Sequence, residues 1–216
     1  MRNLYGKQLN DLNGQLITMG HIVEQAIEHA IEALMHRDID KAKRNIAQDD
    51  EIDQQEKDIE ALCLKILMKQ QPVASDLRQI SSVLKMITDL ERIGDQAADI
   101  SELSISLAGY DQLPDMSIIK RMAAESMTMV VESINAYVSK DAQAAAAVIA
   151  KDDVIDDLFV NERDALIHQI RENRDFAEAA ADLLMAAKYF ERIGDHASNI
   201  ADWAIYSITG EHTKNA

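Results

Sequence analysis

One pentapeptide, Glu-Arg-Ile-Gly-Asp, occurs twice in this chain of 216 residues, at 91–95 and again at 191–195. The residues that precede the two copies also repeat, with an offset of 103 that becomes 100 after a three-residue shortening near the loop following Met68. Self-similarity at a fixed spacing indicates a duplicated structural unit. The chain is therefore expected to fold as two copies of one arrangement.

Apolar residues recur at every third or fourth position along almost the whole chain, which is the pattern of amphipathic helices. The first such stripe consists of Leu9, Leu12, Leu16, Met19, Val23, Ile27, Ile31 and Leu34. The chain holds only two Pro and seven Gly, and aromatic residues make up 4% of it. This composition favours an all-α protein with a core of Leu, Ile, Ala and Met.

A few residues mark the helix boundaries in the first half. Asp38 can cap a second helix, Pro72 ends that helix, and Ser75 can cap a third. The segment 109–114 contains a Gly and the other Pro, and it is the clearest linker in the chain. Three helices are therefore expected before this linker.

The second half shows the same kind of boundaries. Asp115 or Ser117 can start a fourth helix, and Asp141 can cap a fifth. Residues 175–178 begin with Asp and end with Glu, which predicts a capping box at the start of a sixth helix. Gly210 is expected to end that helix.

Six long helices joined by short loops predict an all-α fold of two tandem antiparallel three-helix bundles. We expect the first bundle in residues 1–110 and the second in residues 111–216. Each copy of the pentapeptide then lies on the third helix of its bundle. The internal duplication predicts a pseudo-two-fold axis between the bundles.

The chain is strongly acidic, with 38 Asp and Glu against 22 Lys and Arg and a formal net charge of −16. This charge disfavours binding to nucleic acids and anionic lipids, for which Lys and Arg clusters supply the affinity. The apolar run 144–150 is too short to span a bilayer, and the N-terminus lacks the apolar region of a signal peptide. We expect a cytoplasmic protein that is not inserted in a membrane. The only cysteine, Cys63, is expected to be a buried core residue.

Each pentapeptide places carboxylates on one face of a helix, because residues four apart are neighbours there. The resulting ladders are Glu91, Asp95 and Asp99 in the first half, and Glu191, Asp195 and Asn199 in the second. Like charges at this spacing destabilise a helix by a few tenths of a kcal/mol. A glycine inside a helix costs about 1 kcal/mol relative to alanine. A chain that tolerates both effects twice is expected to gain a function from them.

One interpretation is a metal site in each half. Clustered carboxylates bind hard divalent or ferric ions, and multinuclear sites share bridging carboxylates. The glycine would let another helix or a ligand approach closely. The second helix of each bundle offers further ligands at a spacing of four, namely Asp49 and Asp53 in the first half and Asp152 and Asp156 in the second. Other acidic residues expected nearby are Glu56, Glu60 and Glu162.

A plainer interpretation is a solvated acidic face with ordinary helix packing. In that case Gly94 and Gly194 mark close helix crossings, and Arg92 and Arg192 pair with carboxylates such as Asp89, Asp95 and Asp195. A single copy of the pentapeptide would favour this interpretation. An identical pentapeptide in both halves favours a functional surface.

Little in the sequence supports an enzyme. It has no Glu-x-x-His pair of a di-iron site, no glycine-rich phosphate loop and no nucleophilic triad. His196 follows Asp195, but Gln96 replaces it in the first copy, so a shared ligand role is not expected. One alternative is a carboxylate–metal enzyme that acts on phosphoanhydrides, and another is a helical adaptor without metal. The cations that could hold phosphate in such an enzyme are Lys85, Arg92, Lys188 and Arg192.

Three features together resemble the PhoU family: the paired pentapeptides, the stretch Gln-Gln-Pro-Val-Ala-Ser-Asp-Leu-Arg at 70–78, and the stretch Ile-Gly-Asp-His-Ala-Ser-Asn-Ile-Ala at 193–201. The resemblance covers the whole chain, including its length and its two-fold repeat. It implies two tandem three-helix bundles, in agreement with the helical pattern.

For function, the resemblance implies a cytoplasmic negative regulator of phosphate uptake and of the phosphate-starvation response, rather than an enzyme. It implies an adaptor between the phosphate ABC transporter, through its ATPase subunit, and a sensor histidine kinase. It also implies a homodimer, and metal ions such as iron, zinc, manganese or magnesium at the acidic motifs, including multinuclear centres.

Carried over to this sequence, the implied ligands are Glu91, Asp95 and Asp99 in the first half and Glu191, Asp195 and Asn199 in the second. Asn199 stands where the first half has Asp99, so the two sites are expected to differ in charge and occupancy. The hypothesis is that two metal-loaded acidic faces dock basic patches of the kinase or of the transporter ATPase, with avidity from the repetition.

Overall fold

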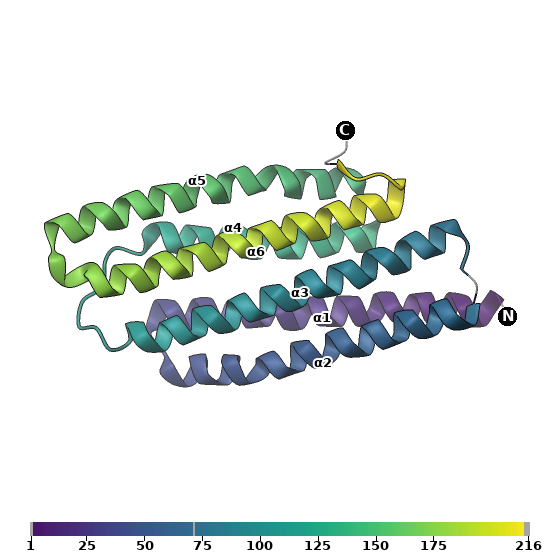
Figure 1. Ribbon diagram of the computed structural model, residues 1–216, viewed down its shortest axis with the longest axis horizontal. Helices are drawn as coiled ribbons and strands as arrows, with labels where there is room; N and C mark the ends of the chain where they lie inside the picture. The colour runs from purple at the N-terminus through teal and green to yellow at the C-terminus, as the bar shows by residue number, and fades with distance from the viewer. Residues whose placement is uncertain (1, 71, 214–216) are drawn as a thin grey trace.

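The computed structural model describes residues 2–70 and 72–213 and shows six long helices (Figure 1). They are α1 (Arg2–His36), α2 (Ile39–Gln70), α3 (Ala74–Leu107), α4 (Ser117–Ser139), α5 (Ala142–Glu172) and α6 (Ala177–Thr209), with a short 3₁₀ helix, η1 (Arg174–Phe176), before α6. The described part of the chain contains no β-strand, so the predicted all-α class is confirmed. Within that part, no helix combines the length and the apolar character needed to cross a membrane.

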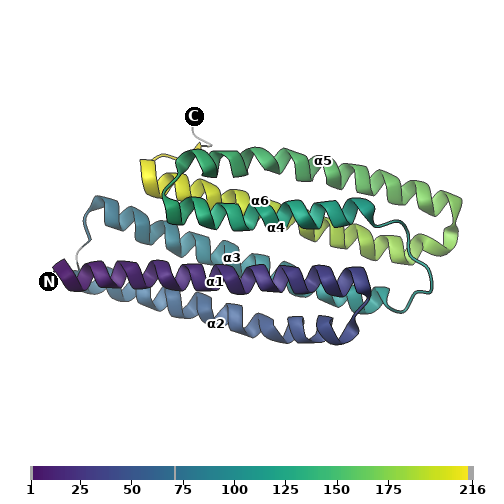
Figure 2. The ribbon, with the colours of Figure 1, turned by 180° about the vertical axis from the view of Figure 1, so that it is seen from behind.

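The helices form two bundles that lie one upon the other. Helices α1, α2 and α3 pack against one another, and so do α4, α5 and α6. Along the middle of the molecule α3 and α6 lie side by side and antiparallel, and α1 also contacts α4 (Figures 1 and 2). The predicted pair of antiparallel three-helix bundles is therefore confirmed.

A single apolar core runs through both bundles. Phe190 and Leu90, at equivalent positions of α6 and α3, are both fully buried. Burial of one such side chain contributes about 1.5–3 kcal/mol to folding. Cys63 is fully buried as predicted, and burial raises the pKa of its thiol to about 12. Because the core continues across the contact of α3 with α6, the two halves form one body.

Three predicted helix boundaries are confirmed. The Asp38 carboxylate accepts a hydrogen bond from the backbone N–H of Lys41 at 2.9 Å, at the start of α2. Asp141 caps α5 by accepting from the N–H groups of Gln143 and Ala144. Gly210 ends α6 in the left-handed conformation that favours glycine, with φ of 87°.

The predicted start of the fourth helix is also confirmed, whereas two other boundary predictions are wrong. Helix α3 begins at Ala74, so Ser75 lies inside its first turn, and Val73 at the N-cap makes no side-chain bond. Helix α4 begins at Ser117, as predicted, and its N-cap Met116 makes no side-chain bond. The predicted capping box of Asp175 and Glu178 is absent, because Asn173 caps η1 instead and this 3₁₀ turn leads directly into α6.

Candidate functional site

The first acidic cluster brings together carboxylates from facing sides of α2 and α3. We define it as Asp49, Asp53, Glu56, Glu91, Asp95 and Asp99. Helix α2 comes close to α3 at Gly94, where a Cβ atom would lie 2.8 Å from Ile52 Cδ1 and 3.3 Å from Asp49 Oδ1. The predicted close helix crossing is therefore confirmed. The missing side chain of Gly94 leaves room for the Asp49 carboxylate beside the ladder of α3.

Carboxylates in this cluster raise one another's pKa values. Burial raises the pKa of Asp49 to about 6, and the charges of Asp95, Asp53, Asp50 and Asp99 add to the effect. Burial and the neighbouring Asp95 likewise raise the pKa of Glu91. The negative charge of the first acidic cluster is thus only partly compensated by the protein's own cations.

Arg92 is the nearest counter-charge on α3. Its Nη1 atom lies 3.0 Å from Asp95 Oδ2, and its Nε atom lies 3.4 Å from Glu91 Oε2. Its side chain is 54% exposed, so these ion pairs contribute at most about 1 kcal/mol. The predicted pairing of Arg92 with acidic neighbours is confirmed, but it leaves Asp49 and Asp53 without that counter-charge.

The second acidic cluster repeats the same crossing between α5 and α6. We define it as Asp152, Asp156, Glu191 and Asp195. A Cβ atom on Gly194 would lie 3.0 Å from Ile155 Cδ1 and 3.6 Å from Asp152 Oδ1. Ile155 and Gly194 are the equivalents of Ile52 and Gly94 at the predicted offsets. The duplication therefore reproduces the crossing as well as the sequence.

In the first cluster, Lys57 on α2 places its Nζ atom 3.2 Å from Asp53 Oδ2. In the second cluster the ammonium group comes from α6 instead, from Lys188. Its Nζ atom lies 2.5 Å from a carboxylate oxygen of Glu191 and 5.2 Å from the centre of the Phe159 ring. Burial and Glu191 raise the pKa of Asp156, whereas the charge of Lys188 lowers it. The second cluster thus contains an ammonium group of its own.

The first cluster has no such group at the equivalent position. There Thr88 replaces Lys188 and Glu56 replaces Phe159, and the Thr88 hydroxyl donates to Glu56 Oε1 at 3.2 Å. The sequence interpretation missed this contrast, because it considered Lys188 only as a cation for phosphate. The three-residue spacing of Lys188 and Glu191 was the available signal.

The last residue of each acidic ladder, Asp99 in the first half and Asn199 in the second, contacts the other half of the molecule. Asn199 Nδ2 donates to Asp89 Oδ1 at 3.4 Å, and His196 Nδ1 lies 2.9 Å from the same oxygen. On the other side of the pseudo-two-fold axis, the Tyr189 hydroxyl bonds Asp99. His196 therefore contacts the first half of the molecule, a role that the sequence did not predict. The ligand roles of Asp99 and Asn199 stay predictions.

Glu162 does not belong to the second acidic cluster, although the sequence placed it nearby. Its side chain is 1% exposed, and its Oε1 atom has no hydrogen-bond partner within the described residues. Burial, together with the charge of Asp115, raises its pKa to about 7. The equivalent residue of the first half is Ile59, a core residue. Helical spacing alone could not tell this inward position from the acidic face.

The first acidic cluster has the chemistry of a site for a hard cation. Its donors are carboxylate oxygens, which Mg²⁺, Mn²⁺ and ferric ions prefer. The space left by Gly94 and the raised pKa of Asp49 both fit a missing positive charge. Among the described residues, however, no three His, Cys, Asp or Glu side chains form a preassembled metal centre. Small side-chain rotations would be needed to bring these carboxylates onto one ion.

The fold and these clusters define a class: a duplicated, all-helical scaffold with an acidic cluster on each half. The sequence model of the PhoU domain matches residues 16–104 and 119–204, once in each half. The phosphate-specific transport system accessory protein PhoU homolog of Clostridium acetobutylicum is 34% identical over 97% of this chain and 96% of its own length. The homolog of Aquifex aeolicus is 37% identical over 97% and 95%.

Solved structures agree with the sequence matches. The crystal structure of PhoU from Pseudomonas aeruginosa superposes with a TM-score of 0.92 at 33% identity, covering 96% of this chain and all of that one. The phosphate transport system regulatory protein PhoU from Streptococcus pneumoniae gives 0.90 at 26% identity, with 97% and 99% covered. The chain belongs to the PhoU family.

Proposed function

We propose that this protein is an accessory protein of a phosphate-specific transport system that restrains phosphate uptake and the phosphate-starvation response. The family membership supports this function, and so do the relatives, which are named as accessory and regulatory proteins of phosphate transport. The shared length supports it too, since the relatives match over nearly their whole chains.

The proposed mechanism is that of an adaptor in the cytoplasm. The protein would contact the ATPase subunit of the phosphate ABC transporter and a phosphate-sensing histidine kinase, and a homodimer would offer each contact twice. A surface with a net charge of −16 favours partners with basic patches. The two acidic clusters are the proposed contact surfaces.

The observation that carries this proposal is the gathering of carboxylates at the Gly94 crossing, whose charge Arg92 and Lys57 compensate only in part. Burial and the neighbouring carboxylates raise the pKa of Asp49 there to about 6. Iron, zinc, manganese or magnesium ions are the proposed cofactors, held by the carboxylates of the clusters. A bound ion would supply positive charge that removes the repulsion between those carboxylates. Asp49, Asp53 and Asp95 would hold it in the first half, and Asp152, Asp156 and Asp195 in the second.

The alternative of a phosphoanhydride enzyme is less well supported. Two of its four proposed phosphate-binding cations already have partners, since Arg92 pairs with Asp95 and Lys188 pairs with Glu191. A cation engaged by a carboxylate is less available to an anionic substrate. We therefore infer a function in binding rather than in catalysis.

The test measures binding of the purified protein to the transporter ATPase subunit and to the cytoplasmic part of the kinase, with and without EDTA. A double variant, Asp49→Asn with Asp95→Asn, should weaken binding about tenfold or more, a change of about 1.4 kcal/mol. The variant Asp11→Asn alters an exposed carboxylate on α1 outside both clusters and serves as control.

Two outcomes separate the versions of this proposal. Equal partner binding with and without EDTA would support an adaptor without metal and reject the metal-dependent version. Unchanged binding of the double variant would reject the acidic clusters as contact surfaces. Elemental analysis of the purified protein then identifies which metal, if any, it carries.

A further inference from the structure

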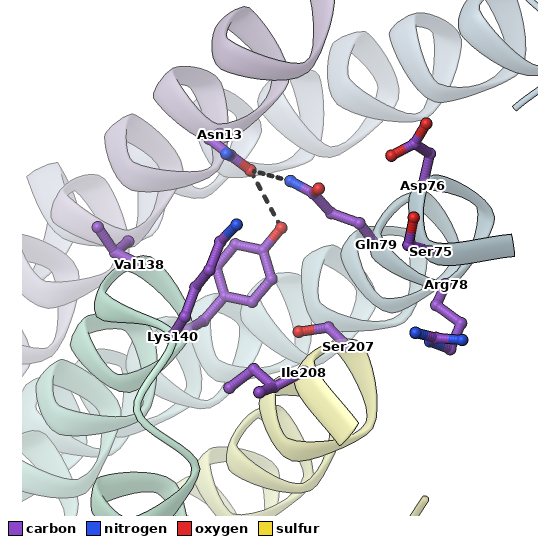
Figure 3. Close-up of a pocket in the computed structure, with 10 residues that line it drawn as sticks. Asn13, Ser75, Asp76, Arg78, Gln79, Val138, Lys140, Ser207 and Ile208 are labelled. Atoms are coloured by element: carbon purple, nitrogen blue, oxygen red, sulfur yellow. Dashed lines mark hydrogen bonds between the residues drawn. The ribbon is translucent and has the colours of Figure 1, made fainter. Parts of the chain in front are cut away.

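A cavity of about 320 Å³ lies at one end of the molecule, far from both acidic clusters. It is formed where the first turns of α3 meet the ends of α4 and α6, with α1 at its side (Figure 3). Arg78 and Glu91 are separated by thirteen residues of α3, which is about 20 Å along a helix. Part of the stretch 70–78 lines the cavity. This stretch takes no part in either acidic cluster, so the proposed function gives it no role.

Two cations line this cavity in a protein that is otherwise strongly acidic. Arg78 comes from α3 and Lys140 from the end of α4, and in Figure 3 they stand on different sides of the cavity. The described residues include no ion pair for either side chain, and the Nε atom of Arg78 is buried without a hydrogen-bond partner. Buried donors are normally satisfied, so this one indicates a missing acceptor.

Lys140 reaches the cavity from a helix end with a strained backbone. Lys140 has φ of 56° and ψ of 42°, the left-handed conformation in which helices usually place glycine. A residue other than glycine costs about 1–2 kcal/mol in this conformation. Arg37, at the equivalent position of the first half, has the same conformation with φ of 54°, so this strain is common to both halves and does not by itself point to the cavity.

Comparison with the opposite end of the molecule shows that the cationic lining is particular to this cavity. The equivalents of Arg78 and Gly210 are Glu178 and Tyr110, and the Tyr110 hydroxyl lies 3.4 Å from Glu178 Oε2. The pocket at that end is lined by residues such as Tyr110, Asp111 and Asp175, and no Lys or Arg is among its described lining residues. Arg37, the equivalent of Lys140, is engaged there by the carbonyl of Tyr110.

Gly210 helps to keep the cavity open on the side of Arg78. A Cβ atom on Gly210 would lie 3.6 Å from Arg78 Nε, so the guanidinium packs directly over the glycine. A bulky side chain there, like Tyr110 at the opposite end, would occupy the space next to the cation. The duplication therefore supplied two related ends, and only at this one do two cations, Arg78 and Lys140, line the cavity.

We propose that this cavity binds a small oxyanion, a free phosphate or the phosphoryl group of a small phosphate monoester. Both cations have long flexible side chains that can close on such an anion from two sides. The Ser75 hydroxyl, in the first turn of α3, adds a donor at the positive end of that helix.

The rest of the lining holds the cavity in shape and limits its affinity. Asn13 Oδ1 accepts hydrogen bonds from Gln79 Nε2 and from the Tyr137 hydroxyl, each at 3.0 Å (Figure 3). This network ties α1, α3 and α4 together and preorganises the cavity. The carboxylate of Asp76 also lines it and opposes an anion.

The test is calorimetric titration of the full-length protein with inorganic phosphate and with glycerol phosphate, with acetate for comparison. EDTA is present throughout, so that phosphate cannot bind through metal ions at the acidic clusters. We expect Lys140→Gly to weaken phosphate binding about tenfold while the melting temperature stays equal or rises. Asp76→Asn should tighten the binding.

A matched control is available at the equivalent position of the first half. Arg37 also has a positive φ, of 54°, but its guanidinium donates to the carbonyl of Tyr110 outside the cavity. Arg37→Gly makes the same backbone change without removing a cation from the cavity, so it should leave phosphate binding unchanged. Arg78→Gln should weaken binding as Lys140→Gly does.

Tighter binding of glycerol phosphate would identify phosphate monoesters as the ligand class, and the reverse order would identify free phosphate. Either order supports the site. Absence of binding at about 10 mM of both probes would overturn the proposal. Equal weakening by Arg37→Gly and Lys140→Gly would also overturn it. None of these outcomes depends on partner or metal binding, so failure here would leave the proposed function untouched.

Discussion

The two halves of this protein share one backbone design but differ in how they balance buried and clustered charge. In the first half, Lys57 of α2 pairs with Asp53 and Arg92 of α3 pairs with Asp95, and the core position Ile59 is apolar. In the second half, Lys188 pairs with Glu191 inside the acidic cluster, and the core position holds Glu162.

This difference shows which part of the duplication is tightly constrained. The glycine and isoleucine of each helix crossing are the same in both halves, because the distance between the helices leaves space for little else. The charged residues around the crossing diverged, because side chains at the cluster's rim reach water and tolerate exchange. Both clusters are partly neutralised, the first by Lys57 and Arg92 and the second by Lys188. The first half is the better candidate for a bound cation because its cluster holds six carboxylates against four in the second.

The largest effect is expected from Glu162. Its pKa is about 7 in the folded protein against 4.5 for a free side chain, so the folded state binds more protons between these values. Its stabilising contribution is complete below about pH 4.5 and is lost as pH rises through 7. Wild-type protein should lose up to about 3 kcal/mol more stability over this range than Glu162→Gln.

Chemical denaturation at several pH values measures this effect, with Glu60→Gln, an exposed site on α2, as control. Glu162→Ile copies the residue of the first half and should raise the melting temperature at pH 8, because it removes an unpaired buried acid. Identical pH profiles for wild type and Glu162→Gln would contradict the assignment of Glu162 as a buried titrating group.

The next effect concerns the cation preference of the two clusters. Thr88→Lys places an ammonium group next to Glu91 and should weaken Mn²⁺ binding at the first cluster about tenfold, or 1.4 kcal/mol. Lys188→Thr should strengthen binding at the second cluster in the same proportion. Calorimetry in backgrounds carrying Asp95→Asn or Asp195→Asn separates the two sites. If Thr88→Lys left the Mn²⁺ affinity of the first cluster unaltered, the exchange of Thr88 and Lys188 between the halves would have no effect on cation binding.

The smallest effect is expected at the helix crossings. Gly94→Ala should destabilise the protein by about 1 kcal/mol, because the contacts with Ile52 and Asp49 outweigh the gain in helix propensity. Gly194→Ala meets looser contacts, 3.0 and 3.6 Å instead of 2.8 and 3.1 Å with the isoleucine, and should be nearly neutral. Thermal unfolding of the two variants and of the wild type measures these differences in stability.

Gly14→Ala is the control for the helix propensity term, since no atom lies within 4 Å of its added Cβ. It should stabilise α1 by up to about 1 kcal/mol. A greater loss in Gly194→Ala than in Gly94→Ala would show that the second crossing is the tighter one.

Local chemistry made the fold predictable. Long amphipathic repeats and scarce Pro and Gly predicted six helices, and Asp38, Asp141 and Gly210 marked boundaries where the structure has them. The predictions at Ser75 and at the pair Asp175 and Glu178 were wrong although these residues are suited to capping. The helices begin after other N-cap residues, Val73 for α3 and Phe176 for α6. In the second case η1 leads into α6, a local conformation that residue types alone do not specify.

The sequence by itself determined the duplication, the all-α fold, the family and the carboxylates of each ladder, because helical spacing fixes neighbours on one helix. Only the tertiary structure decided which carboxylates face α2, that Lys188 neutralises one cluster, that Glu162 points into the core, and that Arg78 and Lys140 line one cavity. These pairs lie on different helices or depend on burial. Their proximity follows from how the helices pack, which spacing along a single helix cannot encode.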